Sequence, residues 1–212
     1  MTSAADLVLD AWHGRHRPAD GSWQRIAPWR PDLYAVLSFT GHAAVSAPPD
    51  VSDGDLTAWG VDGFGGAHDP RVMARLVGDA GWVDVLDAVL VAAGSGADGG
   101  GALVERPDLA AHPRAVHAAE VRDDVSVHGW PGRDDVVVTL GRSFGGLAVV
   151  SYEVAPSARG TGLGTRTVRE ARALVPAGEP VLALVSPGNV ASLRAALAGG
   201  FEPVGSAQLY RP

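Results

Sequence analysis

The alternation of apolar and polar residues is clearest in the second half of the chain. Strand-like patterns cover 121–130, 135–142 and 147–154, and short segments rich in glycine, proline and aspartate separate them. Connections this short join antiparallel neighbours. The pattern therefore predicts a three-stranded antiparallel meander.

Apolar residues at helical spacing follow the meander over about 162–175. A short, wholly apolar segment at 181–186 is typical of a buried parallel strand. A second helix is expected over about 189–198, and a final strand begins at Phe201. This alternation of helices and strands after a meander predicts an α/β architecture.

The first half has a weaker pattern. Residues 33–46 are predicted to form a bent strand or a hairpin around Gly41, because β-branched and aromatic residues flank this glycine. The segments 17–31 and 53–69 are rich in residues that break regular structure, namely proline, glycine and aspartate. Both segments are therefore predicted to be loops.

Three further segments lie between these loops and the meander. Asp69 and Pro70 suit the cap and the first position of a helix that continues over 71–77. The segment 82–92 keeps helical spacing and is predicted to be a buried helix, with a strand as the alternative. The glycine-rich segment 94–101 has the composition of a flexible linker or disordered loop.

The composition excludes several classes of enzyme. The 212 residues, of which 46% are apolar and 19% are charged, are typical of a globular protein with one large or two small domains. The chain has no cysteine, which excludes disulfides, thiolate metal sites and cysteine nucleophiles. All 17 basic residues are arginine, so a lysine Schiff base and a Walker-type phosphate loop are excluded as well.

Charge is distributed unevenly, since residues 1–115 carry 15 acidic residues and eight arginines whereas 116–212 carry nine of each. Neither half has the basic stripe of a nucleic-acid-binding protein. No apolar run approaches the roughly 18 residues of a membrane-spanning helix, and the first residues lack the order of a secretory signal. We therefore expect a cytoplasmic protein that binds neither nucleic acid nor membrane.

The most informative motif lies between the last meander strand and the next helix, and it reads Arg159-Gly160-Thr161-Gly162-Leu163-Gly164. Glycines at alternate positions let backbone N–H groups converge, and the start of the helix adds its positive dipole end. The motif therefore predicts a binding site for phosphate or pyrophosphate. The competing dinucleotide motif GxGxxG would need a third glycine at Thr165 and a parallel βαβ unit in place of the meander.

This motif resembles the R/Q-x-x-G-x-G/A motif of the GNAT superfamily of acyl-CoA-dependent N-acetyltransferases. A second segment also resembles the family, through the apolar strand at 181–186, the helix start Asn189-Val190-Ala191-Ser192-Leu193 and the strand start Gly200-Phe201. The resemblance covers roughly residues 121–210. It implies the GNAT fold, an α/β class with a mixed, mostly antiparallel sheet that is flanked by helices and splays between its fourth and fifth strands.

The resemblance suggests a division of the chain into two parts. Residues 119–212 would be the acyl-CoA-binding core of the GNAT type. Residues 1–118 would be an N-terminal α/β section of unassigned family, longer than the elements that normally open the fold, which completes or covers that core.

The resemblance also implies roles for individual residues. The pantetheine arm of acetyl-CoA would pair with the exposed strand edge at about Tyr152 to Val154, and the Val154 N–H would polarise the thioester carbonyl. The residues predicted to bind the pyrophosphate are Arg159, Gly160, Thr161, Gly162, Leu163, Gly164 and Thr165. Asn189 and Ser192 would lie beside the pantetheine, although a simple helix cap explains Asn189 equally well.

Acyl transfer to an amine also requires a proton acceptor and a proton donor. Alternation along the last meander strand places Glu153 on a face that becomes polar toward the glycine motif, so Glu153 is the first candidate for the general base. A surface glutamate is the alternative interpretation, and His128 is the second candidate base. A tyrosine that donates the proton in many family members is replaced by Ala196, which leaves Tyr152, Tyr210 or water as the donor.

Pairs of histidines such as His13 and His16 lack the carboxylate of an HExxH site, so we expect no metal. The resulting hypothesis is an enzyme that transfers acetyl from acetyl-CoA to a primary amine of a small molecule or peptide by direct attack. The alternative is a catalytically degenerate acyl-CoA-binding sensor or scaffold, which the alanine at 196 favours. The sequence leaves the oligomeric state open, a homodimer included.

Overall fold

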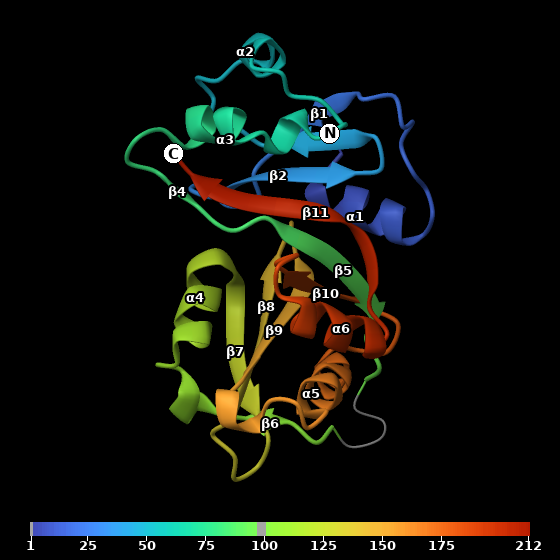
Figure 1. Ribbon diagram of the computed structural model, residues 1–212, viewed down its shortest axis with the longest axis vertical. Helices are drawn as coiled ribbons and strands as arrows, with labels where there is room; N and C mark the ends of the chain where they lie inside the picture. The colour runs from blue at the N-terminus through green and yellow to red at the C-terminus, as the bar shows by residue number, and fades with distance from the viewer. Residues whose placement is uncertain (1, 97–100) are drawn as a thin grey trace. The chain divides into compact units, whose positions relative to one another are not determined.

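The computed structural model in Figure 1 describes residues 2–96 and 101–212. The chain divides into two compact units: unit 1 is Met1–Val89 with Val204–Pro212, and unit 2 is Leu90–Pro203. It passes between the units within the strands β5 (Asp87–Ala93) and β11 (Glu202–Arg211). The boundaries of these compact units differ from the division into 1–118 and 119–212, which rests on family resemblance and stays a prediction.

Unit 1 contains a small mixed sheet. Its strand order is β1 (Trp23–Arg25), β3 (His42–Val45), β2 (Tyr34–Phe39) and β11, and β4 (Trp82–Val83) also pairs with β11. Only β1 and β3 run parallel among these pairs. The predicted hairpin is therefore confirmed as β2 and β3, with Gly41 in the left-handed conformation at its turn.

The helices of unit 1 are α1 (Ala4–Trp12), α2 (Asp53–Ala58), the short η1 (Gly66–His68) and α3 (Pro70–Val77). The predicted helix with Asp69 as its cap is confirmed as α3. The predicted loop over 53–69 is wrong in part, because Ser52 and Asp55 form a capping box that starts α2. The predicted loop over 17–31 likewise contains β1.

The predicted helix over 82–92 is wrong, because this segment contains β4 and most of β5. Val89 to Ala92 are all buried, and a short apolar run fits a buried strand as well as a buried helix. The segment predicted at 94–101 as a flexible linker or disordered loop has no regular secondary structure at 94–96, but its backbone there is held by hydrogen bonds. The amides of Gly94, Ser95 and Gly96 donate to the carbonyls of Glu179, Arg172 and Val175, whereas 97–100 lie outside the described residues.

Unit 2 contains a sheet whose strands follow the order β5, β10, β9, β8, β7 and β6. Their bounds are Pro180–Val185 for β10, Leu147–Val154 for β9, Val136–Ser143 for β8, Asp123–Gly129 for β7 and Val104–Glu105 for β6. The pairs from β6 to β9 are antiparallel, and β10 runs parallel to β9. The meander, the parallel strand and the mixed, mostly antiparallel α/β class are thus confirmed.

Three α-helices flank this sheet, namely α4 (Pro113–Val121), α5 (Leu163–Ala171) and α6 (Val190–Ala198). Short 3-10 segments are η2 (Pro107–Leu109), η3 (Pro156–Ala158) and η4 (Arg172–Leu174). Tyr152 of β9 lies near Gly164 of α5, whereas its neighbour Ser151 contacts Arg122, directly after α4. Adjacent strand residues point to opposite faces, so α4 covers one face and α5 the other.

The strands β9 and β10 separate at one end. They pair from Ala148 with Val181 to Val150 with Ala183, whereas β8 pairs with β9 along its whole length to Val154. The four residues from Ser151 to Val154 therefore lack β10 as a partner, as the predicted splay requires. This separation opens the side of β9 that faces α5 and α6. In the part of the chain that the structure describes, no helix is both long and apolar enough to span a membrane.

Candidate functional site

A pocket of about 490 Å³ lies where β9 separates from β10. This volume falls within the range of roughly 300–1,000 Å³ that is typical of small-ligand sites. Its walls come from α4, the end of β9, the loop into α5 and the first turns of α6. The lining residues are Arg114, Tyr152, Glu153, Val154, Arg159, Gly160, Gly162, Gly164, Thr165, Asn189, Ala191, Ser192 and Ala195.

The structure brings together most of the residues that the sequence singles out. Every predicted cofactor-binding residue except Thr161 and Leu163 lines this pocket, and so do both predicted catalytic residues, Glu153 and Val154. His128 does not line it. The shared location of these residues is a structural fact, whereas their roles stay predictions.

The glycines of the loop at 159–165, which we call the cofactor loop, have different functions in the backbone. Gly160 and Gly162 adopt the left-handed conformation, with φ of 77° and 79°, and a Cβ at either would meet no atom within 4 Å. Gly164 lies inside α5, where a Cβ would come 3.7 Å from the Tyr152 ring. The first two glycines thus shape the loop and leave open space beside it, and the third allows Tyr152 to lie close to α5.

The start of α5 lies at the pocket and has no side-chain cap for its first amides. Gly162 is the residue that caps α5, and it provides no side-chain acceptor for the first helical N–H groups. The same helix end carries partial positive charge. The guanidinium of Arg159 is held beside the loop, since its Nε donates to the Val154 carbonyl over 2.9 Å. This arrangement can bind an anion such as a pyrophosphate.

The free edge of β9 presents a backbone donor to the same pocket. The Ala155 N–H donates to the Asp135 carbonyl over 2.8 Å, which places it on the side of β8. Successive residues of a strand direct their N–H groups to alternate sides. The Val154 N–H therefore points away from β8, into the space that β10 leaves open.

Asn189 and Ser192 are joined by the helix cap that the sequence offers as one of two interpretations. The Asn189 side-chain oxygen accepts a hydrogen bond from the Ser192 N–H over 3.2 Å, at the start of α6. Both residues also line the pocket. The cap fixes the position of the helix start, and it leaves the Ser192 side chain at the pocket wall.

Tyr152 places a hydroxyl between α5 and α6. This hydroxyl is buried and forms no hydrogen bond of normal length with any described residue. Burial raises the pKa of Tyr152, and the nearby Ser192 side chain partly opposes that rise. Ala196, the position at which the sequence resemblance implies a tyrosine in many relatives, is fully buried and offers no polar group. Tyr152 thus lines the pocket, while its hydroxyl oxygen itself is buried.

The other predicted proton-transfer groups lie elsewhere. His128 is buried on β7, where its Nε2 lies 2.9 Å from the Ser126 hydroxyl. Burial lowers the pKa of His128, and Glu105 partly opposes this. Tyr210 is also fully buried, and its hydroxyl donates to the Ser46 carbonyl over 2.6 Å. These two residues are held by contacts of their own and do not reach the pocket.

Arg114 is the charged pocket residue that sequence analysis missed. It belongs to the first turn of α4, and its Nε lies 3.6 Å from the Glu153 Oε2. That distance is an ion pair rather than a hydrogen bond, and the Arg114 Nε is buried without a hydrogen-bond partner among the described residues. No local motif marks this arginine, because only packing of α4 on the sheet places it beside Glu153.

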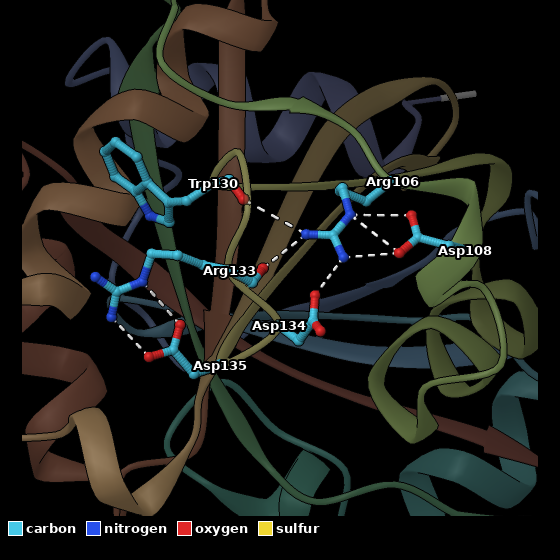
Figure 2. Close-up of polar contacts among 6 residues, drawn as sticks. All are labelled: Arg106, Asp108, Trp130, Arg133, Asp134 and Asp135. Carbon is cyan, nitrogen blue, oxygen red and sulfur yellow. Dashed lines mark hydrogen bonds and ion pairs between the residues drawn. The ribbon is translucent and has the colours of Figure 1, made fainter.

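The turn between β7 and β8 contacts elements that line the pocket. Figure 2 shows the turn at 130–135, which we call the braced turn, with the Arg106 guanidinium between Asp108 and Asp134. The same guanidinium donates to the carbonyls of Trp130 and Arg133. The hydrogen bonds to Asp108 and Asp134 raise the pKa of Arg106, so its guanidinium stays protonated.

The braced turn is joined to α5 and to the end of β9. The Trp130 indole N–H donates to the Thr167 hydroxyl over 3.0 Å, and the Arg166 guanidinium lies 4.3 Å from the Trp130 ring centroid. The Asp135 carbonyl accepts the Ala155 N–H. The turn therefore fixes both elements between which the cofactor loop runs.

The described residues contain no group of three or more histidine, aspartate or glutamate side chains placed to hold a metal ion. The polar groups of the pocket are instead two arginines, one glutamate, a tyrosine, short hydroxyl and amide side chains, and backbone amides. The two guanidinium groups and the backbone amides among them suit an anionic ligand.

Comparison with known proteins gives structural neighbours but no sequence relatives. No family profile and no curated protein matches the chain. A GNAT-family acetyltransferase from Colwellia psychrerythraea is 13% identical, over 68% of this chain and 62% of its own, with a TM-score of 0.42. A GCN5-related N-acetyltransferase from Kribbella flavida is 15% identical, over 68% of this chain and 64% of its own, with a TM-score of 0.37.

A GCN5-related N-acetyltransferase-like protein from Streptococcus suis is 11% identical, over 86% of this chain and 84% of its own, with a TM-score of 0.43. The chain thus spans less than two thirds of the first two proteins. These solved proteins, to which the chain is structurally similar, are described as GNAT acetyltransferases or acetyltransferase-like proteins. The sequence motifs of this chain resemble the same family.

Proposed function

We propose that this protein is an acyltransferase of the GNAT type, which transfers acetyl from acetyl-CoA to a primary amine by direct attack. The observation that carries the proposal is the meeting of two features in one pocket. The free edge of β9 offers a backbone donor there, and the uncapped start of α5 offers an anion site beside it. Acetyl-CoA combines the two matching groups, a thioester carbonyl and a pyrophosphate.

The pocket residues suggest how acetyl-CoA would be held. The cofactor loop and the start of α5 would receive the pyrophosphate through backbone amides, with Arg159 as an additional cation. The pantetheine amides would pair with the edge of β9 next to Asn189 and Ser192. The thioester would then lie near the Val154 N–H.

The reaction needs one bond to form and one to break. The neutral amine nitrogen attacks the thioester carbon, and the Val154 N–H stabilises the oxyanion, a contribution worth roughly 2.7–4 kcal/mol for one well-placed donor. Glu153 accepts the proton that the amine loses. The C–S bond then breaks, and the Tyr152 hydroxyl donates a proton to the thiolate of CoA.

The competing function is binding of acyl-CoA without catalysis, as a sensor or scaffold. The buried alanine at 196 favours this function, because it removes the proton donor that many GNAT enzymes have at that position. Binding and catalysis are separable by experiment, since only the enzyme releases CoA thiol when an amine is added.

The test combines ligand binding with turnover of the full-length chain. Thermal unfolding is measured with acetyl-CoA, CoA, NADH and ATP, because a ligand that binds the native state raises the apparent stability. We expect stabilisation by both CoA species and amine-dependent release of thiol from acetyl-CoA. Stabilisation by NADH alone contradicts the whole proposal, and stabilisation by CoA without thiol release favours the sensor.

A further inference from the structure

The part of the pocket wall that α4 and the end of β9 form carries one pair of opposite charges. Arg114 reaches it from α4, and Glu153 reaches it from β9. The two side chains are 37% and 39% exposed, so a ligand can reach both of them. Their charged atoms lie 3.6 Å apart, which leaves the pair loosely engaged.

Arg114 has donors that the protein does not use. Its Nε is buried and has no hydrogen-bond partner among the described residues. A guanidinium offers donors in a planar fork that matches a carboxylate in two parallel hydrogen bonds. The Nε itself is shielded from solvent, but the side chain is 37% exposed, so a ligand carboxylate can approach the rest of the guanidinium and pair with its charge.

The cofactor does not account for Arg114. The anion site for the pyrophosphate lies on the cofactor loop, at the start of α5, where Arg159 is also held. Arg114 belongs to the helix that covers the opposite face of the sheet and lies beside the candidate base. Its position therefore fits the acceptor rather than acetyl-CoA.

Resting on the proposed N-acetyltransferase function, we propose that the acceptor is a free α-amino acid, with its carboxylate on Arg114 and its amino group on Glu153. An α-amino acid carries both charges on one carbon, which matches two opposite side chains in close contact. Each charged group of the protein then exchanges its loose partner for one from the ligand. A polyamine would instead place a second positive charge near Arg114, which is unfavourable.

The experiment compares each of a panel of free amino acids with its own amide, in the presence of acetyl-CoA and the full-length chain. The amide keeps the side chain and the α-amine and removes only the negative charge. Thiol release gives kcat/KM, expressed per concentration of neutral amine because amides are weaker bases. We expect the amino acid to be preferred over its amide by at least about tenfold for the best side chain.

The matching variants are Arg114→Gln and Arg114→Lys. In Arg114→Gln the preference should fall to within about threefold, and Arg114→Lys should recover part of it because the charge remains. Thermal unfolding checks that both variants are folded. Calorimetry should show an unchanged Kd for CoA in Arg114→Gln. A lost acceptor preference together with an unchanged Kd for CoA is predicted neither by a structural role of Arg114 nor by a role in cofactor binding.

Three results would overturn this inference in distinguishable ways. Equal acetylation of amino acids and their amides removes the amino-acid acceptor and leaves the N-acetyltransferase function intact. A weakened Kd for CoA in Arg114→Gln, with the acceptor preference unchanged, assigns Arg114 to the cofactor. Absence of both CoA binding and thiol release with any amine removes the proposed function, and this inference with it.

Discussion

The braced turn and the cofactor loop both connect elements of unit 2, but they satisfy their backbone groups differently. In the turn, the Arg106 guanidinium occupies two carbonyls and two carboxylates, and its side chain is only 14% exposed. In the cofactor loop, the helix start has no side-chain cap and two glycines leave open space. The braced turn is thus saturated by its own side chains, whereas the loop before α5 leaves donors that a ligand would satisfy.

The largest expected effect concerns Glu153 at the end of β9, next to the cofactor loop. Glu153→Gln keeps the size of the side chain and removes its ability to accept a proton. We expect kcat to fall by on the order of 10²-fold near neutral pH, with less loss at higher pH because more acceptor is already neutral. Steady-state thiol release measures this, and the Kd for CoA should be unchanged. A kcat within about threefold of the unaltered protein would show that Glu153 is not the base.

The second prediction tests the charge of the ligand at the cofactor loop. Gly162→Asp places a carboxylate where the pyrophosphate is expected, and Gly162→Asn is the matched control, since asparagine has the same shape without the charge. Both variants should share the strain of the left-handed backbone. We expect Gly162→Asp to bind CoA roughly 10–100-fold more weakly than Gly162→Asn, because like charges repel at a helix N-terminus. Equal Kd values by calorimetry would locate the anion elsewhere.

The third prediction tests the braced turn, whose backbone groups are satisfied by Arg106. Arg106→Gln removes contacts to two carbonyls and two carboxylates, whereas Arg133→Gln removes one surface ion pair to Asp135. Thermal unfolding should show a clearly larger fall in Tm for Arg106→Gln, because an exposed ion pair contributes little. Similar values of Tm for the two variants would mean that the turn does not depend on Arg106.

The smallest expected effect is a loss of stability in acid. The pKa of Asp108 is lowered by its hydrogen bond to Arg106, and that of Asp135 by its hydrogen bond to Arg133. Because both values lie below those of the unfolded chain, their stabilisation is complete above the ordinary range near pH 4 and is lost as pH falls through the folded values. Tm measured from about pH 5 to pH 3 should therefore decline less in the Arg106→Gln, Arg133→Gln double variant. An equal decline would exclude these pairs as the cause.

The sequence by itself determined the features that depend on near neighbours. The meander and the parallel strand followed from alternation and from short turns, and Asp69 marked the start of α3. The glycines at 160 and 162 marked a loop before a helix, and in the structure both adopt the left-handed conformation. Each of these signals is contained in a few consecutive residues, so pattern and residue type were sufficient.

Only the tertiary structure decided which distant side chains meet. Pairing with distant strands, β11 for β4 and β10 for β5, made strands of most of 82–92, because a short apolar run fits a helix or a strand until its neighbours are known. The packing of α4 on the sheet brought Arg114 to Glu153, and the same fold held His128 away from the pocket. Residue type sets what a side chain can do, but the long-range packing of apolar faces sets where it lies, and no local pattern contains that information.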